Sequence, residues 1–464
     1  MESIWIFLKE ELLILAKLII PIYFTIFISN INSLFLPAIF AGHIGDVAKN
    51  YAVVGLSTCF VTTAGIYAHN FISCAVNTLG SQAYGAGKNK ELGTLLQRGL
   101  LIHSLMSLTI AIIWINAENI LLLLHQSPEL SKMCGEFMWV MLPILPAYAI
   151  IYPTMRILQV QKIVLPTMII LVSSTLIESI LCYVLTNYTL LGIKGIAIAV
   201  VITFIYQAIA HLVYIRCSSV WERIWGGFTW MALQKWGQYL YYGFPLLIMT
   251  LLHDGVFSLG NIVVGATSSN AAVDLSEYSA VLYIEYCLYV LSSCMNIASS
   301  IRVGILVGED NISRMKKVCV LTTSVTLLLV LVQVSVLLAG SSLWGKMFIS
   351  DQEVAQGIVN IIFVIAAYQP IDGVVENFLG ILVGIGKQWL GIVFPIAFFV
   401  IATPSAILLS VVAKLGPLGY WMGIMIAFIT RAIYLIPLNL CCVRWNKITS
   451  VLDSVSISPE NNST

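Results

Sequence analysis

The chain has 464 residues, of which 59% are hydrophobic and only 10% are charged, whereas soluble domains carry about 25% charged residues. Its 23 basic and 22 acidic side chains nearly cancel, so nothing in the charge balance indicates a nucleic acid or another acidic partner. These values exclude an ordinary soluble domain and predict an all-α integral membrane protein with many spans.

Apolar runs separated by charged residues, glycine or proline predict about twelve transmembrane helices. Each run is long enough to cross a bilayer, which takes roughly 20 apolar residues. The predicted spans are 13–39, 51–74, 98–120, 134–154, 163–185, 193–215, 238–264, 276–300, 318–341, 357–382, 390–412 and 418–440.

The connections between these spans differ in charge. Most lysines and arginines, including Arg98, Arg156 and Arg302, fall in one alternate set of loops. The positive-inside rule places this set in the cytoplasm, and an even number of spans then places both termini there as well. The sequon at Asn187 would be on the exterior. We expect a multi-pass protein of the plasma membrane.

The chain also contains two copies of one six-helix pattern. The glycine-rich segment 80–88 has a counterpart at 302–310, and 158–162 has one at 382–388, shifted by nearly the same interval. An offset of six spans preserves orientation, so the sequence predicts parallel repeats around a central cavity. The predicted parts are an N-lobe (1–215), an amphipathic cytoplasmic linker along the inner interface (216–237), a C-lobe (238–445) and a cytoplasmic tail (446–464).

The tenth predicted span carries a polar stripe. Gln369, Asp372 and Glu376 are spaced i, i+3 and i+7, so on a helix they share one face. A charged carboxylate at mid-bilayer costs about 3 kcal/mol, so such residues normally face water, a partner or a substrate. Two carboxyls one turn apart repel each other when both are charged, so we expect protons and a cation to compete for them. The alternative is a structural hydrogen-bonded pair or an interfacial helix end.

Further acids lie in apolar spans. Asp254 lies in the seventh span beside His253, Glu285 in the eighth and Glu178 in the fifth. Each could instead be a buried, neutral, hydrogen-bonded acid. Arg431 is the only clear basic candidate deep in a span, which favours a cationic cargo.

Aromatic residues near these acids could bind an organic cation through their ring faces. In membrane helices, however, such residues commonly serve packing or interface belts. The candidates are Tyr283, Tyr286, Tyr289 and Tyr368.

Several motifs together resemble those of the multidrug and toxic compound extrusion family, in its eukaryotic branch. They occur in the family's order along nearly the whole chain: 42–45, 80–87, 96–98, 302–304 and the segment from Asp372 to Gln388. The resemblance implies two six-helix bundles with a central cavity, and efflux of organic cations in exchange for protons, or for sodium in some bacterial members. Asp372 falls where the family has its acid in the tenth helix.

Two positions depart from the family pattern. The acid typical of vertebrate relatives in the eighth helix falls at Tyr283, whereas this chain has Glu285 two residues later. In the seventh helix those acids fall at His253 and Ser258, whereas this chain has Asp254. Either the acids have moved or the alignment contains a gap. The first helix has Asn30 and Asn32 but no acid, which removes the basis for a mechanism through an aspartate there.

The resulting hypothesis is a proton-coupled antiporter for organic cations and xenobiotics, not an enzyme, with membrane lipid as its surroundings. Asp372, Glu376, Glu285 and Asp254 are the predicted coupling residues, and Tyr283, Tyr286, Tyr368 and Gln369 the predicted substrate contacts. No cofactor is expected, and the ten cysteines show no metal-binding spacing. The alternatives are a flippase of a lipid-linked substrate on the same fold, a sodium-coupled exporter, or a receptor without transport. An intramembrane aspartyl protease is disfavoured because Asp372 lacks the expected glycine context.

Overall fold

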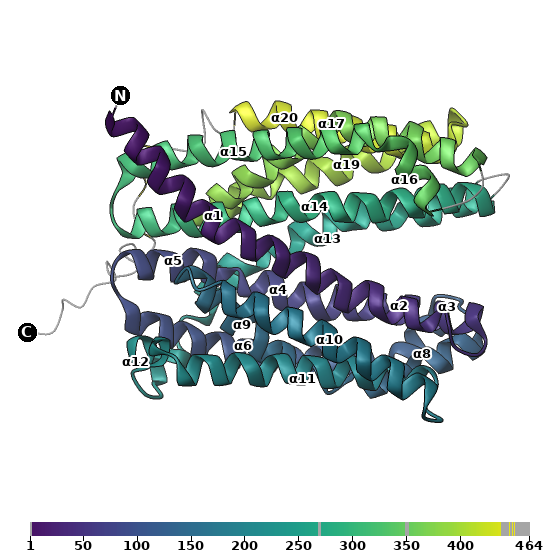
Figure 1. The fold of residues 1–464 in the computed structure, drawn as a ribbon, viewed down its shortest axis with the longest axis horizontal. Helices are drawn as coiled ribbons and strands as arrows, with labels where there is room; N and C mark the ends of the chain where they lie inside the picture. The colour runs from purple at the N-terminus through teal and green to yellow at the C-terminus, as the bar shows by residue number, and fades with distance from the viewer. Residues whose placement is uncertain are drawn as a thin grey trace, which may run out of the picture. The chain divides into compact units, whose positions relative to one another are not determined.

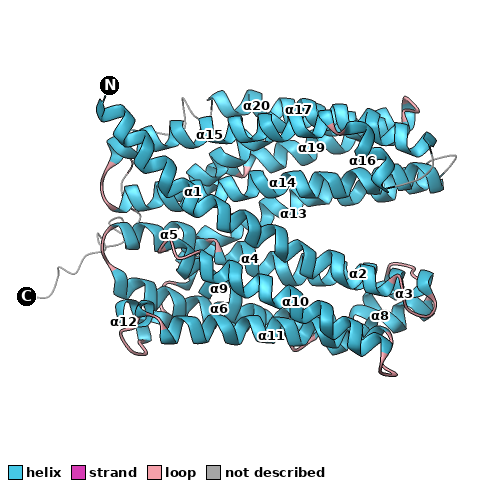
Figure 2. Ribbon diagram, in the orientation of Figure 1, coloured by secondary structure: helices cyan, strands magenta, loops and turns pink. Residues whose placement is uncertain are grey.

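The structure is a computed structural model that describes residues 2–267, 271–348 and 352–437, with isolated positions 445, 448 and 450. Within these residues every regular element is helical (Figure 2). Apart from positions 448 and 450, the predicted tail 446–464 lies outside the described residues.

The predicted transmembrane organisation is confirmed. In the described part of the chain, 11 helices are long and apolar enough to cross a membrane, and the bent pair Pro128–Met141 and Ile144–Val160 brings the number up to 12. The two halves of that pair meet at an angle of 55°. The chain is therefore an integral multi-pass membrane protein with an all-helical fold.

The helices form two compact units, Met1–Gly243 and Phe244–Thr464. Figure 1 colours them in chain order. The long helices of the first unit are broken by the π-helical turns η1 (Ile31–Phe35) and η2 (Val61–Tyr67). Its α-helices are α1 (Glu2–Asn30), α2 (Leu36–Ala41), α3 (Val47–Phe60), α4 (Ala68–Ser73), α5 (Ala75–Gly85), α6 (Asn89–Ile115), α7 (Ala117–Leu123), α8 (Pro128–Met141), α9 (Ile144–Val160), α10 (Leu165–Asn187), α11 (Ile193–Cys217) and α12 (Ser219–Ile224).

The boundary between the two units falls inside α13 (Trp236–Thr267). Residues of α13 up to Gly243 belong to the first unit, and those from Phe244 belong to the second. Its last spans are α19, which ends in the π-helical turn η4 (Leu408–Val412), and α20. The α-helices after α13 are α14 (Ala271–Gly308), α15 (Ile312–Ala339), α16 (Ser341–Phe348), α17 (Gln352–Gly384), α18 (Gln388–Gly391), α19 (Val393–Ile407) and α20 (Gly416–Pro437).

Each unit has its own hydrophobic core. Trp114, Tyr148 and Ile196 are among the fully buried residues of the first core. Tyr278, Ile361 and Trp421 are among the fully buried residues of the second core. The two repeats therefore fold around separate interiors.

The four turns of the two predicted repeat pairs close with the same type of backbone hydrogen bond. In the pair 80–88 and 302–310, the N–H of Lys88 donates to Ala83 O and that of Asn311 donates to Leu306 O, both at 2.9 Å. The pair 158–162 and 382–388 closes in the same way, with Ile163 donating to Leu158 at 2.9 Å and Lys387 donating to Leu382 at 2.7 Å.

In each turn the preceding residue adopts positive φ, which is the geometry of a Schellman helix end. These residues are Gly87, Lys162, Asp310 and Gly386. Only two of them are glycine, so the turn geometry is repeated where the sequence is not.

The closest helix pair that concerns the site is α14 and α17. A Cβ on Gly380 would lie 2.2 Å from Asn296 O, and one on Gly384 would lie 2.7 Å from Ser300 O. Only glycine lets the two backbones approach this closely. Because α17 carries the predicted polar stripe, this packing holds the stripe against α14.

The linker between the units is fastened to α6 through its backbone. Lys90 Nζ donates to Glu222 O and Trp225 O at 3.0 and 2.7 Å. Gln97 donates to Gly227 O at 2.8 Å and accepts from the N–H of Thr229 at 3.2 Å. After these contacts the linker continues into the 3-10 turn η3 (Trp230–Leu233). Phe228 and Trp230 are 92% and 82% exposed. This is the arrangement expected of a segment at a membrane interface.

Candidate functional site

The polar stripe of α17 points into the interior of the second unit. Gln369 and Asp372 are fully buried and Glu376 is 6% exposed. The amide oxygen and nitrogen of Gln369 have no hydrogen-bond partner. Oδ2 of Asp372 also lacks one, although the hydroxyl of Ser292 is close by. Buried polar atoms without a partner are costly, and in a native site they mark contacts left for a ligand or proton.

Both acids of the stripe face Arg431 of α20. Arg431 is 1% exposed, with Nη1 3.4 Å from Asp372 Oδ1 and Nη2 3.3 Å from Glu376 Oε1. One guanidinium therefore bridges two carboxylates that are one helical turn apart on α17. Sequence reasoning noted Arg431 only as a sign of the cargo's charge, because its approach to residues 55 and 59 positions away has no signal in a single sequence.

Two aromatic rings lie close to this guanidinium. Its central carbon lies 5.4 Å from the Phe398 ring centroid and 5.2 Å from that of Phe428. Tyr368 stacks on Phe428 at 4.4 Å with the ring planes 8° apart. Carboxylates together with neighbouring aromatic rings are the contacts that recognise a delocalised organic cation.

A second hydrogen-bond network supports Glu376 from α14. The amide of Asn296 donates to Glu376 Oε2 at 3.1 Å. On the same stretch of helices, Ser299 donates to Asn377 at 2.6 Å, and Asn377 donates to Thr323 of α15 at 3.0 Å. Three helices thus fix the orientation of this part of α17.

The other two predicted acids meet at one small pocket. Asp254 and Glu285 line it together with Phe257, Tyr286 and Tyr289. His253 of α13 completes the lining. Its Nδ1 lies 3.2 Å from Asp254 Oδ1, and its ring stacks between Tyr289 and Phe398 with centroids 5.4 and 5.3 Å away. His253 thus links the pocket to the rings around Arg431.

The predicted substrate contacts are not all alike. Tyr368 is fully buried beside Phe428, and Tyr286 lines the pocket. Tyr283, by contrast, is 38% exposed. The structure therefore brings together Asp372, Glu376 and Tyr368, and at the adjoining pocket Asp254, Glu285 and Tyr286, with Tyr283 directed elsewhere.

The first unit contains a buried arginine that the sequence analysis assigned to a cytoplasmic loop. Arg156 lies within α9 and is 1% exposed. It donates to Asn70 at 2.7 Å and Gln159 at 2.9 Å, and lies 3.4 Å from the Ser73 hydroxyl. The expectation that Arg156 lies in a loop was therefore wrong, since it is a buried residue of a helix. Neutral amides can satisfy a guanidinium, and this removes the need for a nearby acid in the sequence.

A chain of buried hydrogen bonds lies near this arginine. His69 Nδ1 is 2.9 Å from His103 Nδ1, and His103 Nε2 is 3.5 Å from the Tyr239 hydroxyl. On the other side, the Ser107 hydroxyl lies 3.3 Å from His69 Nε2. Glu178 of α10 is fully buried, and both of its carboxyl oxygens lack a partner.

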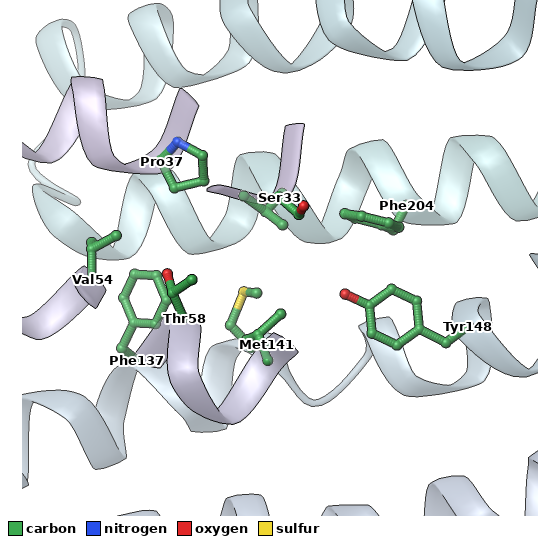
Figure 3. Close-up of a pocket in the computed structure, with 10 residues that line it drawn as sticks. Ser33, Pro37, Val54, Thr58, Phe137, Met141, Tyr148 and Phe204 are labelled. Carbon is green, nitrogen blue, oxygen red and sulfur yellow. The ribbon is translucent and has the colours of Figure 1, made fainter. Parts of the chain in front are cut away.

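The first unit also has a mainly apolar pocket (Figure 3). It is lined by Ser33, Pro37, Val54, Thr58, Val61, Phe137, Met141, Tyr148, Val200 and Phe204. The Tyr148 ring packs edge-on against Phe204 with centroids 5.1 Å apart, and its buried hydroxyl has no hydrogen-bond partner. Across the described residues, no three His, Cys, Asp or Glu side chains gather closely enough to hold a metal ion.

Comparison with known proteins places this geometry in context. The family model described as MatE matches residues 18–184 and 245–408. Multidrug and toxin extrusion protein 1 of Mus musculus is 31% identical over 393 residues, which are 84% of this chain and 68% of the mouse protein. The Homo sapiens protein of the same name is 26% identical over 436 residues, or 93% of this chain and 75% of the human one.

The fold matches solved transporters. The crystal structure of the eukaryotic MATE transporter AtDTX14 superposes with a TM-score of 0.87 at 22% identity, over 95% of this chain and 98% of that one. A MOP superfamily transporter from Pyrococcus furiosus superposes with a TM-score of 0.80 at 16% identity, over 91% and 93%. At these identities the likeness shows the fold alone.

Proposed function

The chain belongs to the MatE family, and on that premise we propose that it is a proton-coupled antiporter that extrudes small organic cations and xenobiotics. Its named relatives are multidrug and toxin extrusion proteins, which supports efflux rather than catalysis of a reaction. The loop charges favour cytoplasmic termini. The proposal places the protein in the plasma membrane, with cargo moving from the cytoplasm to the outside.

One observation carries the proposal. Asp372 and Glu376 face a single guanidinium, so the buried trio carries one net negative charge when both acids are ionised. A low-dielectric interior penalises net charge. One proton makes the trio neutral, and so does one monovalent cation, whereas both together leave an excess positive charge. Proton and cation therefore exclude each other, and this is what exchange requires.

The position of each acid indicates its proposed role. Asp372 is the principal proton and cation site, because it is the fully buried acid of the stripe and contacts Arg431 through one oxygen only. Glu376 tunes it, since Asn296 and Arg431 hold both of its oxygens. Glu285 and Asp254 support cation binding from the adjoining pocket.

The ring faces and the buried amide complete the proposed substrate site. Tyr286 and Tyr368 offer ring faces, and Gln369 offers unpartnered amide atoms. Tyr283 is the weakest of the proposed contacts because it is exposed.

The test is transport by the full-length chain in proteoliposomes. An acidic interior should drive uptake of labelled tetraethylammonium by the wild type, and Asp372→Asn should lower gradient-driven uptake by about tenfold or more. Glu129→Gln is the control, because that acid lies on the surface beside Lys49. Equal uptake without a proton gradient would reject proton coupling. Uptake that followed a sodium gradient instead would identify sodium as the coupling ion.

A further inference from the structure

Arg431 occupies the position of a cation between Asp372 and Glu376. Its guanidinium bridges the two carboxylates at 3.4 and 3.3 Å, and its central carbon lies 5.4 and 5.2 Å from the ring centroids of Phe398 and Phe428. A guanidinium keeps its proton in proteins. Arg431 is therefore a permanent positive charge inside the proposed cation site, held by the same kinds of group that would hold the cargo.

This fixed charge changes how much further positive charge the site can take. Without Arg431, the two carboxylates would need two positive charges to reach neutrality; with it, they need one. Other charged and titratable groups face the trio, and substituting Arg431 removes none of them. They are His253 and Asp254 from α13, Glu285 and Tyr289 from α14, and Tyr368 from α17. Whatever charge these groups carry, Arg431 reduces by one the number of positive charges that the site needs to reach neutrality.

We propose that Arg431 is a specificity-determining residue that selects singly charged cations over doubly charged ones. This rests on the proposed function, because it assumes that Asp372 and Glu376 bind the cargo. The guanidinium offsets one of the two negative charges of the carboxylates before the cargo binds. A dication then changes the trio of Arg431, Asp372 and Glu376 from one net negative charge to one net positive charge, whereas a single charge makes it neutral, and a buried site disfavours net charge.

The competing interpretation is an ion pair that only holds α20 to α17. Such a pair would stabilise the helix packing, and its removal would change stability or expression but not the preference between ligands of different charge. The ratio of two affinities separates the two interpretations, because loss of folded protein lowers the signal for both ligands alike.

The experiment measures equilibrium binding to the purified full-length transporter at fixed ionic strength. The ligands are tetramethylammonium and a bis-quaternary ion in which two trimethylammonium groups are joined by a two-carbon linker. This linker suits carboxylates one helical turn apart, about 5–6 Å. We expect Arg431→Gln to shift the ratio of dissociation constants towards the dication by about tenfold or more, which corresponds to about 1.4 kcal/mol.

Three variants make the result specific to charge. Arg431→Lys keeps the positive charge and should keep the wild-type ratio. Combining Arg431→Gln with Glu376→Gln removes one charge of each sign and should restore that ratio. Arg156→Gln removes a buried arginine from the first unit, where its partners are neutral, and should leave the ratio unchanged.

Two results would overturn the inference: a folded Arg431→Gln protein with the wild-type ratio, or a shift that persists in the double variant. If Arg431→Gln does not fold, the double variant is compared with Glu376→Gln alone, which differs from it only at Arg431. The ratio should lie further towards the dication in the double variant, and equal ratios would overturn the inference. Binding ratios need no gradient. Failure of the gradient-driven uptake assay would therefore reject proton coupling without affecting the measured ratio of dissociation constants. An unchanged ratio in Arg431→Gln would likewise reject the role of Arg431 without affecting the evidence for proton coupling.

Discussion

Glu285 and Tyr283, two residues apart on α14, face different surroundings: Glu285 is 3% exposed and lines a pocket with His253, whereas Tyr283 is 38% exposed. A vertebrate-like acid at position 283 would therefore not point into this pocket. The acid of this chain, Glu285, stands at a position from which α14 reaches the interior.

The first prediction uses this pair. Glu285→Gln should reduce gradient-driven uptake by about tenfold, because it removes a carboxyl from the pocket that also holds Asp254. Tyr283→Phe should retain uptake within about twofold. The measurement is initial uptake rate in proteoliposomes at matched protein content. A larger loss in Tyr283→Phe than in Glu285→Gln would contradict the assignment.

A second prediction concerns the contact of α14 with α17. Gly380→Ala should destabilise the protein by about 2 kcal/mol, since overpacking typically costs 1–3 kcal/mol and the new Cβ would lie 2.2 Å from Asn296 O. Gly255→Ala is the matched control, because its Cβ would meet only Phe399, at 3.8 Å. Thermal unfolding in detergent should show a lower Tm for the first variant and an equal or higher Tm for the second. Equal Tm changes in both would reject the close packing.

Two buried tyrosines give opposite expectations for loss of a hydroxyl. Tyr148→Phe should leave stability unchanged or raise it by about 1 kcal/mol, because its hydroxyl is buried without a partner. Tyr278→Phe should lower stability by about 1 kcal/mol, because its hydroxyl donates to Phe257 O at 2.7 Å. Chemical denaturation of both variants at one protein concentration tests the contrast, and the reverse order would refute it.

A fourth prediction concerns the linker. Gln97→Ala should raise amide hydrogen exchange in residues 227–233 by about tenfold, because the Gln97 side chain bonds both Gly227 O and Thr229 N. Gln126→Ala, an exposed residue in a loop before α8, is the control. Exchange in 227–233 that matched the wild type would show that the linker is held by other contacts.

The spans could be predicted because bilayer thickness imposes a length and a composition on each helix. The predicted limits 193–215 agree closely with the structural span Ile193–Cys217. The second span was predicted to end at 74 but runs from Lys49 to Gly85, because apolarity ends before the helix does. The π-helical turns were not predicted, since they add one residue to a turn without a change in composition.

The site was predictable only in part, because the periodicity of one helix does not show which residues of other helices pack against it. The stripe of Asp372 and Glu376 follows from helical periodicity on one segment, and both side chains are buried as such a stripe requires. Their partner Arg431 lies on another helix, and a lone arginine in a span does not reveal which carboxylates it meets. The sequence marked His253 as a neighbour of Asp254 and as a position where relatives have an acid, but not its contacts with the rings of Phe398 and Tyr289.

The linker attachment has a consequence for the order of synthesis. The first unit includes residues up to Gly243, so its last part is the beginning of α13, where Tyr239 is fully buried beside His103. A ribosome that had made only the first six spans would present an N-terminal half still lacking this tyrosine and the linker bonds to α6. The contacts of the first unit are therefore complete only once the first turns of the seventh span have been made.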